Sequence, residues 1–408
     1  MNMLQNRSVT WFLAVLAAVL VICIMIYPDH AFQSSLSGLT IWWTFVFPAL
    51  LPFLILSEIL IGTGLVRAFG TLLEPLMRLL FRLPGYGGWS IAMGLFAGYP
   101  AGARTTSQLQ HQSFSISLGE AQRLLALSHL SHPVLMLTVI GVGFLNSAAT
   151  GVFLAIVHYS SAVLMDLIMR VINSSAKSSL DKMPPHQNES SRYALYAQAW
   201  INMKLYQAED GRTFGKLLGD AVGNAIQALL LLGGIIMFFS VLHRMISILL
   251  PYFYTDSWIG WIIPAVLEPH LGAYIVSQTP MLTLDMKIAL ICALLAWSGL
   301  SVLVQVKSLL FYSQLRFAPF LLTRLLHSGL AFVMAVLLWR PFNNWIPTTQ
   351  PSLKYTEPLQ PSMQAWVEWS VWSSSTRLLF LCFLFLITLT VLSTLIGFIH
   401  RWHKQQTP

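Results

Sequence analysis

Residues 124–131 read LLALSHLS, and residues 294–301 read LLAWSGLS. Six of the eight positions are identical when the chain is shifted by 170 residues. At the same shift two shorter pairs match: Gly102-Ala103 with Gly272-Ala273, and Ser107-Gln108 with Ser277-Gln278. Because several matches share one offset, we interpret them as an internal repeat.

The repeat lies in a chain that is too apolar for an ordinary soluble protein. Of its 408 residues, 56% are hydrophobic and 9% are charged, whereas soluble domains carry about 25% charged residues. The apolar residues form long blocks, which excludes a soluble enzyme and a disordered scaffold. Nor do long blocks fit the short alternating strands of an outer-membrane barrel. We therefore predict an all-α integral membrane protein.

Helices that cross a bilayer need roughly 20 residues. By this criterion we expect eight spans, over residues 10–28, 38–64, 121–145, 147–170, 218–245, 287–309, 319–340 and 376–399. Two further apolar stretches, 87–110 and 257–280, are interrupted by Gly and Pro. A basic amphipathic stretch, 65–84, is expected at the membrane interface. The block 10–28 has no small-residue cleavage site after it, so we expect a retained helix rather than a signal peptide.

Basic residues in the loops predict the orientation of the chain. Seven of them lie between Arg170 and Lys216, whereas Lys354 is alone between residues 343 and 375. We therefore expect the first segment and both termini in the cytoplasm, and the second segment outside. The predicted domains are an N-terminal helix and loop (1–37), a first repeat (38–172), a cytoplasmic linker (173–216), a second repeat (217–342), an extracytoplasmic loop (343–375) and a C-terminal helix and tail (376–408).

This orientation makes the two repeats inverted, so that the interrupted segments 87–110 and 257–280 enter from opposite faces of the membrane. Inverted repeats with Gly/Pro-interrupted segments are typical of secondary transporters, whose binding site lies near the midplane. Irregular backbone at that depth is tolerated only where it lines a protein interior or a wet cavity. We therefore predict a transporter with two re-entrant hairpins.

Residues 94–104, GLFAGYPAGAR, resemble the SGYPAGAK segment of the YlbJ family of sporulation integral membrane proteins, also called SpoVV. Four further segments are similar to that family: 75–85, 120–124, 131–133 and 297–305. The resemblance covers most of residues 40–330 and extends to the gate-domain group of nucleoside and ferrous-iron transporters. The sequence departs from the family at Ala97, where the family has serine, and at His129.

The resemblance implies a role in endospore formation, in which the protein moves dipicolinic acid across the outer forespore membrane towards the forespore. It leaves open a homo-oligomer and a handover to a channel of the inner forespore membrane. The chain has no P-loop, so a gradient or substrate trapping must supply the energy. The coupling ion, proton or sodium, is left open, and no cofactor is expected.

Two alternatives to this function remain. One is a non-transporting membrane assembly factor needed for sporulation, and the other is a carrier for nucleosides or metal ions. The net charge of +8 does not indicate a nucleic-acid partner, because Lys and Arg lie mainly at the ends of apolar blocks. There they set orientation and contact anionic lipid headgroups.

Dipicolinate is a planar dianion, so its site needs positive potential and hydrogen-bond donors. Helix N-termini supply both, which makes Gly98, Tyr99, Pro100 and Gly102 of the first interrupted segment candidate substrate contacts. The alternative for these residues is a tight turn between packed helices. Arg104 could bind a carboxylate with its guanidinium fork, or it could anchor the segment at the cytoplasmic surface.

The repeat also relates four serines, Ser128, Ser131, Ser298 and Ser301. At i, i+3 spacing we expect each pair on one side of a helix, where the hydroxyls could donate to a carboxylate or a ring nitrogen. Packing of small polar residues between helices is the alternative. His129, between the first two serines, is a candidate for substrate contact or packing.

Ionisable residues inside apolar segments are candidates for ion coupling. These are Glu58, His132 and Glu268. Glu268 and His270 are the counterparts of Gly98 and Pro100 in the second interrupted segment, and we also expect them to contact substrate. The alternative for the acids is a hydrogen bond that caps a hairpin backbone.

We expect neither a catalytic nor a metal site. The sequence has no G-x-S-x-G and no H-E-x-x-H motif, so the usual arrangements for a hydrolase nucleophile or a zinc peptidase are missing. The three cysteines, Cys23, Cys292 and Cys382, lie in apolar blocks without a CxxC spacing. That distribution predicts neither a disulfide framework nor a zinc site.

Overall fold

The computed structural model describes residues 7–111, 116–172, 192–251, 258–345 and 391. Within these residues the chain is helical and contains no strand. Five helices are long and apolar enough to cross a membrane: Pro28–Gly62, Ala148–Ile172, Phe214–Leu249, Leu284–Leu309 and Phe317–Asn344. They overlap five of the predicted spans, but the first begins at Pro28 rather than residue 38, so part of the predicted N-terminal loop is helical.

The remaining span predictions have different outcomes. The N-terminal block forms α1 (Arg7–Ile26), but its apolar part, Ala14–Ile26, is shorter than the five long helices. The predicted span 376–399 lies outside the described residues apart from Val391, as do most of the predicted loop 343–375 and residues 173–191 of the linker.

The single span predicted over 121–145 is wrong. Helix α8 (Leu118–Ser128) begins with a capping box at Ser117 and ends at Ser128. Residues 129–132 lie outside any helix. A π-helix then runs over Leu135–Phe144. Pro133 explains the interruption, because it has no N–H to donate and disfavours helical backbone at the residue before it.

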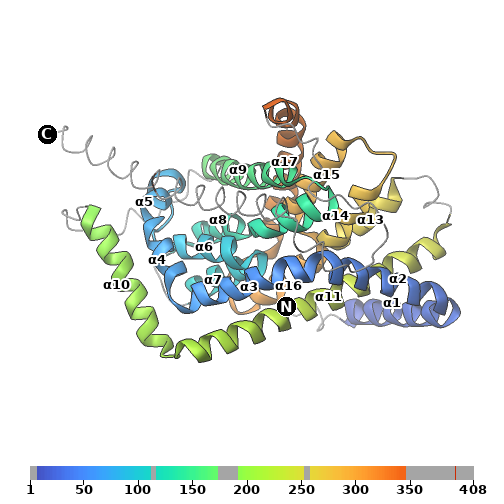
Figure 1. Ribbon diagram of the computed structural model, residues 1–408, viewed down its shortest axis with the longest axis horizontal. Helices are drawn as coiled ribbons and strands as arrows, with labels where there is room; N and C mark the ends of the chain where they lie inside the picture. The colour runs from blue at the N-terminus through green and yellow to red at the C-terminus, as the bar shows by residue number, and fades with distance from the viewer. Residues whose placement is uncertain (1–6, 112–115, 173–191, 252–257, 346–390, 392–408) are drawn as a thin grey trace, which may run out of the picture.

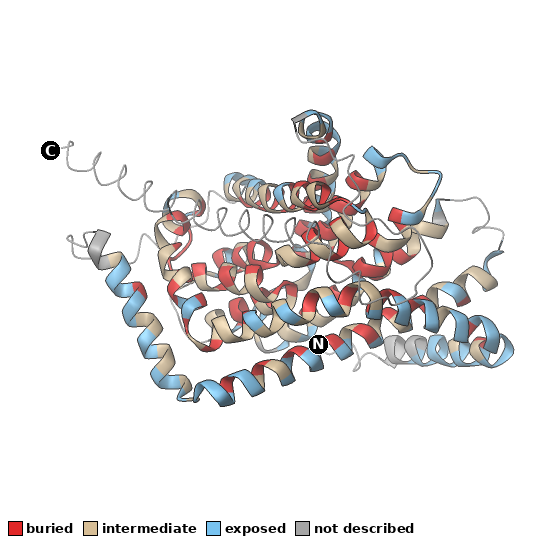
Figure 2. Cartoon of the chain, in the orientation of Figure 1, coloured by how far each residue is buried: buried red, intermediate tan, exposed pale blue. Residues whose placement is uncertain are grey.

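The long helices surround a group of shorter ones (Figure 1). The span Pro28–Gly62 consists of α2 (Pro28–Ile41), a π-helical turn Trp42–Val46 and α3 (Phe47–Gly62). Helices α9 (Ala148–Ile172), α15 (Leu284–Trp297) and α17 (Phe317–Trp345) pack together on another side. Buried residues concentrate in the group of shorter helices and in the long helices where they face it, whereas α1 and α10 are largely exposed (Figure 2). The apolar core thus lies where the interrupted helices are.

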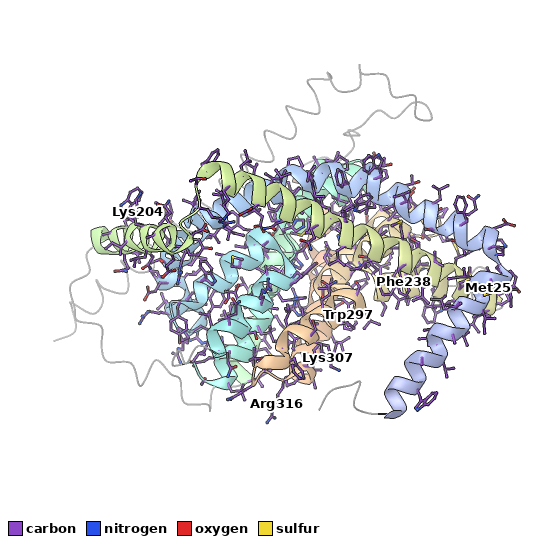
Figure 3. The ribbon with its side chains drawn as sticks, turned by 90° about the horizontal axis from the view of Figure 1, so that it is seen from below. Met25, Lys204, Phe238, Trp297, Lys307 and Arg316 are labelled. Carbon is purple, nitrogen blue, oxygen red and sulfur yellow. The ribbon has the colours of Figure 1, made fainter. Side chains whose placement is uncertain are left out.

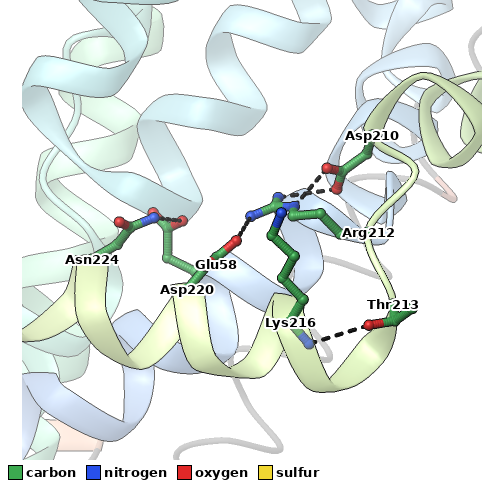
Figure 4. A network of polar contacts seen from close by, with 7 residues as sticks. All are labelled: Glu58, Asp210, Arg212, Thr213, Lys216, Asp220 and Asn224. Atoms are coloured by element: carbon green, nitrogen blue, oxygen red, sulfur yellow. Dashed lines mark hydrogen bonds and ion pairs between the residues drawn. The ribbon is translucent and has the colours of Figure 1, made fainter.

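Helices α10 (Arg192–Asp210) and α11 (Phe214–Leu249) form a bent arm along one edge of the molecule, with Lys204 on the first and Phe238 on the second (Figures 1 and 3). At the corner between them Gly211 takes a positive φ of 61°. Arg212 braces the corner through ion pairs to Asp210 at 2.6 Å and Asp220 at 2.9 Å (Figure 4). These two carboxylates raise the pKa of Arg212.

The amphipathic stretch 65–84 folds as α4 (Leu65–Leu72), α5 (Glu74–Leu76) and a π-helical turn Met77–Phe81. Helix α10 lies against α4. The guanidinium of Arg67 lies 5.1 Å from the centre of the Trp89 ring and 5.5 Å from that of Tyr206. This cation–π contact joins α4, α10 and the first interrupted helix pair.

Each interrupted segment forms two helices. The first comprises α6 (Gly87–Ala97) and α7 (Tyr99–His111), separated by Gly98 at φ 82°. The second comprises α13 (Ile259–Leu267) and α14 (Pro269–Gln278), separated by Glu268 in extended conformation. In both pairs the two helices pack side by side. The glycines make this approach close: a Cβ on Gly272 would collide with the backbone of Ala265.

Candidate functional site

Each interrupted helix pair packs against a second helix that is also interrupted. Gly94 and Gly102, on opposite sides of the first interruption, both lie so close to the carbonyl oxygen of Ser128 that a Cβ on either would collide with it. A Cβ on Gly98 would lie 3.1 Å from the ring of His132. The tip of the first pair therefore rests on the non-helical residues 129–132.

The second half of the chain has the same arrangement. Helices α15 and α16 (Gly299–Leu309) are separated at Ser298, whose φ is 70°. A Cβ on Gly299 would lie 2.6 Å from Cδ of Pro269, the first residue of α14. In Figure 3 Trp297 ends α15, and Lys307 lies on α16 beside the helices of the first half. The predicted span 287–309 is therefore interrupted and not one continuous helix.

Two hydrogen bonds join three of the interruptions into one centre, and the packing of Gly299 on Pro269 adds the fourth. Nε2 of His129 lies 2.9 Å from Oγ of Ser298. The hydroxyl of Tyr99 donates to the carbonyl oxygen of Leu295 at 2.7 Å. The rings of Tyr99 and His129 lie 4.9 Å apart. All of these polar side chains are buried, so the two repeats meet through polar groups at the centre of the apolar core.

The carboxylate of Glu268 makes two contacts at the second interruption. Its Oε2 accepts from the backbone N–H of Leu271 at 2.6 Å, which caps the N-terminus of α14. Its Oε1 lies 2.6 Å from Nδ1 of His270. Both side chains are buried. The first interruption has no equivalent acid, because Gly98 occupies that position.

Polar side chains of α9 and α17 complete the centre. Arg324 donates through Nη1 to the carbonyl oxygen of His129 at 3.1 Å and through Nη2 to that of Ala126 at 2.8 Å. Nε2 of His158 accepts from the backbone N–H of Ser131 at 3.0 Å. Nε2 of His327 lies 2.8 Å from Oγ of Ser161. Long-range packing thus holds the non-helical residues 129–132 in place.

The structure gathers most of the predicted site residues at this centre and leaves two elsewhere. Gathered there, by the contacts above or by their place beside an interruption, are Gly98, Tyr99, Pro100, Gly102, Ser128, His129, Ser131, His132, Glu268, His270, Ser298 and Ser301. Arg104 is exposed on α7. Glu58 lies between α3 and α11, where it accepts from Asn224 at 3.2 Å (Figure 4).

The expectation that each serine pair shares one helix face is wrong. Ser131 lies in the non-helical residues 129–132, and Ser298 has left-handed backbone between two helices. Their hydroxyls therefore take directions that helical spacing does not describe. The hydroxyl of Ser128 instead lies 3.0 Å from that of Thr106 on α7.

Sequence reasoning missed Arg324, His158 and His327. A usable signal was present, since all three are ionisable residues within predicted apolar spans, and such residues are functional candidates by default. Among the described residues no group of three or more His, Cys, Asp or Glu has the geometry of a metal site.

Comparison with known proteins finds a matching family model and a similar curated protein. A family model described as "Gate: Nucleoside recognition" matches residues 43–175. The chain is 38% identical over 329 residues to the "Sporulation integral membrane protein YlbJ" of Bacillus subtilis (strain 168). The aligned region covers 77% of this chain and 79% of that protein. No solved structure shows significant similarity to the chain. With this identity over most of both sequences, the chain belongs to the YlbJ family of sporulation integral membrane proteins.

Proposed function

We propose that the protein is a secondary transporter that moves dipicolinate across the outer forespore membrane and binds it where the four helix interruptions meet. The observation that carries this proposal is the contact between the two halves, in which His129 of one interruption lies 2.9 Å from Ser298 of another. Interrupted helices expose backbone N–H and C=O groups to a ligand at membrane depth, which is how many secondary transporters form their sites.

In this proposal α6/α7 and α13/α14 are re-entrant hairpins that enter from opposite faces, and both termini are cytoplasmic. Their tips, Gly98 and Glu268, are 170 residues apart in the sequence. Movement of one repeat against the other would open the centre to each side in turn. The buried Glu268–His270 pair is our candidate for the site of the coupling ion, because ionisable side chains inside a membrane protein are functional candidates by default.

The centre holds a buried acid, Glu268, and a buried guanidinium, that of Arg324, and the guanidinium favours an anion. Arg324 is 1% exposed, and no ion pair of the described residues includes it. Its fixed positive charge is balanced only partly by the helix carbonyls that it contacts, and a buried cation is costly without an opposite charge. A dicarboxylate would supply that charge. We accordingly propose a carrier without catalytic function or bound cofactor.

A nucleoside is the second candidate substrate, favoured by the description of the matching family model. A nucleoside is uncharged, so it would leave the charge of Arg324 without compensation. Competition separates the two candidates: unlabelled uridine or adenosine should not reduce dipicolinate uptake if the anion is the substrate. Strong competition together with nucleoside uptake would favour the second candidate.

The test is uptake of radiolabelled dipicolinate into proteoliposomes that contain the full chain alone, under proton and sodium gradients. We expect saturable uptake by the wild-type protein. Absence of uptake under every gradient, with folding and insertion verified, would instead support a non-transporting assembly role.

Glu268→Gln should reduce this uptake at least tenfold while the protein still folds. The amide oxygen can still accept from the N–H of Leu271, which preserves the cap of α14, but the side chain is no longer a carboxylate that can bind a coupling ion. The control is Arg104→Gln, which changes an exposed side chain and should keep near wild-type uptake. Normal uptake by Glu268→Gln would exclude the carboxylate as the coupling group.

A further inference from the structure

Buried polar atoms without a hydrogen-bond partner cluster around the interruptions. Among the described residues these atoms include Nδ1 of His129, Oγ of Ser131, Nδ1 of His158, Oγ of Ser301, Nε of Arg324 and Nδ1 of His327. Most buried polar groups in proteins are satisfied, and each exception requires an explanation such as a bound ligand or an ordered water. A cluster of them at the proposed substrate site is a candidate subsite.

At least four of these atoms can donate a hydrogen bond: the hydroxyl of Ser301 on α16, and three that belong to Ser131, His158 and Arg324. Nε2 of His158 accepts from the N–H of Ser131, so the neutral ring carries its proton on Nδ1 and can donate from there. Arg324 uses Nη1 and Nη2 for the carbonyls of His129 and Ala126, which leaves the Nε–H. The hydroxyl of Ser131 is the third donor. It lies near the hydroxyl of Tyr99, whose own proton is donated to the carbonyl oxygen of Leu295.

The three donors belong to one local cluster. The bond at 3.0 Å links Ser131 to His158, and the bond at 3.1 Å links Arg324 to His129, two residues before Ser131. All three side chains are almost completely buried, with exposures of 0%, 0% and 1% for Ser131, His158 and Arg324. Helix capping by Arg324 explains its Nη contacts, but it explains neither its Nε–H nor the other two donors.

We propose that Ser131, His158 and Arg324 form a carboxylate-binding subsite, in which one carboxylate of the substrate accepts hydrogen bonds from the Ser131 hydroxyl, Nδ1 of His158 and Nε of Arg324. The inference rests on the proposed transport of an anion and specifies how one end of it is held. The acceptor must be anionic because it compensates the buried guanidinium. The remaining part of a flat ligand would then lie towards Tyr99 and His129, whose rings are 4.9 Å apart.

The first test measures two effects of Ser131→Ala: the change in melting temperature and the change in Kd for dipicolinate. Removal of a buried hydroxyl that has no partner should leave the melting temperature of the ligand-free protein unchanged or raise it. Loss of a donor to a carboxylate should raise the Kd for dipicolinate about tenfold or more, the equivalent of about 1.4 kcal/mol or more. Ser240→Ala is the matched control, because Ser240 also has a buried, unpartnered hydroxyl but lies at the contact of α11 with Gly38 of α2. The control should change neither affinity nor uptake.

The second test separates the two nitrogens of His158. His158→Gln places an amide oxygen near the position of Nε2, so it can still accept from Ser131, but it has no donor at Nδ1. His158→Asn places an amide N–H near Nδ1 and loses the acceptor. We expect His158→Gln to keep the melting temperature and weaken dipicolinate binding, and His158→Asn to lower the melting temperature and retain more of the binding.

Three measurements are made on the full chain. The first is binding of radiolabelled dipicolinate in nanodiscs, and the second is uptake of dipicolinate. The third is thermal stabilisation by three ligands: dipicolinate, pyridine-2-carboxylate and the uncharged pyridine-2,6-dicarboxamide. Stabilisation by both carboxylates but not by the diamide, reduced in Ser131→Ala and His158→Gln, supports the subsite. If the wild-type protein transports dipicolinate and both variants bind it normally, the subsite is refuted and the transport function stands. If carboxylates bind with loss in the variants but dipicolinate is not transported, the transport function fails and the subsite stands. Absence of stabilisation by any carboxylate refutes both.

Discussion

Gly102→Ala is expected to lower the free energy of unfolding by about 3 kcal/mol and to abolish dipicolinate uptake. A Cβ at this position would collide with the carbonyl oxygen of Ser128 and lie 2.8 Å from its carbonyl carbon. The obstacle is backbone that Arg324 and His158 hold in place around the interruption, so it cannot move aside as a flexible side chain would. The methyl group therefore separates α7 from α8 at the proposed substrate site.

Gly219→Ala is the matched control. Gly219 lies within α11 and no atom is within 4 Å of its Cβ position, so alanine should stabilise the helix by up to about 1 kcal/mol. Denaturation in mixed micelles gives the stability of both variants, and the uptake assay gives their function. If Gly102→Ala matched the wild-type protein in both assays, the close packing of α7 on Ser128 would be incorrect.

Asp166→Asn should lower the free energy of unfolding by about 3–5 kcal/mol, because it leaves a buried guanidinium without its counter-charge. Arg123 on α8 binds Asp166 on α9 through two hydrogen bonds, at 2.6 Å and 3.1 Å. The side chains are 10% and 3% exposed. Arg123 also donates to the carbonyl oxygen of Phe81 at 2.7 Å, so the pair ties three segments together.

The double variant Arg123→Met/Asp166→Leu should recover much of this loss, since it removes both charges together. The exposed pair between Arg67 and Glu209, at 3.5 Å with exposures of 44% and 70%, provides the comparison. There Glu209→Gln should cost less than about 1 kcal/mol. A loss of similar size at the two sites, measured by denaturation, would contradict the role of burial.

The helix interruptions show how far sequence alone can lead. Gly98 with Pro100 and Glu268 with Pro269 predict two broken segments, because glycine permits a positive φ and proline cannot continue a helix. Both breaks are found at these residues. The interruption at Ser298 carries a weaker signal, because it has one glycine, Gly299 with a φ of 75°, and no proline. Serine has no intrinsic preference for a φ of 70°, and the close approach of Pro269 to Gly299 accompanies that backbone.

Composition and local conformational preference are enough to predict a helical membrane protein, its family resemblance and the two breaks in segments 87–110 and 257–280. They do not predict the breaks at residues 129–132 and Ser298. Which polar groups meet at the centre depends on the tertiary structure. Arg324 contacts a carbonyl 195 residues away, and His129 reaches a serine 169 residues away. No local pattern encodes such distant pairs, because the packing of α8, α9, α15 and α17 is what brings them together.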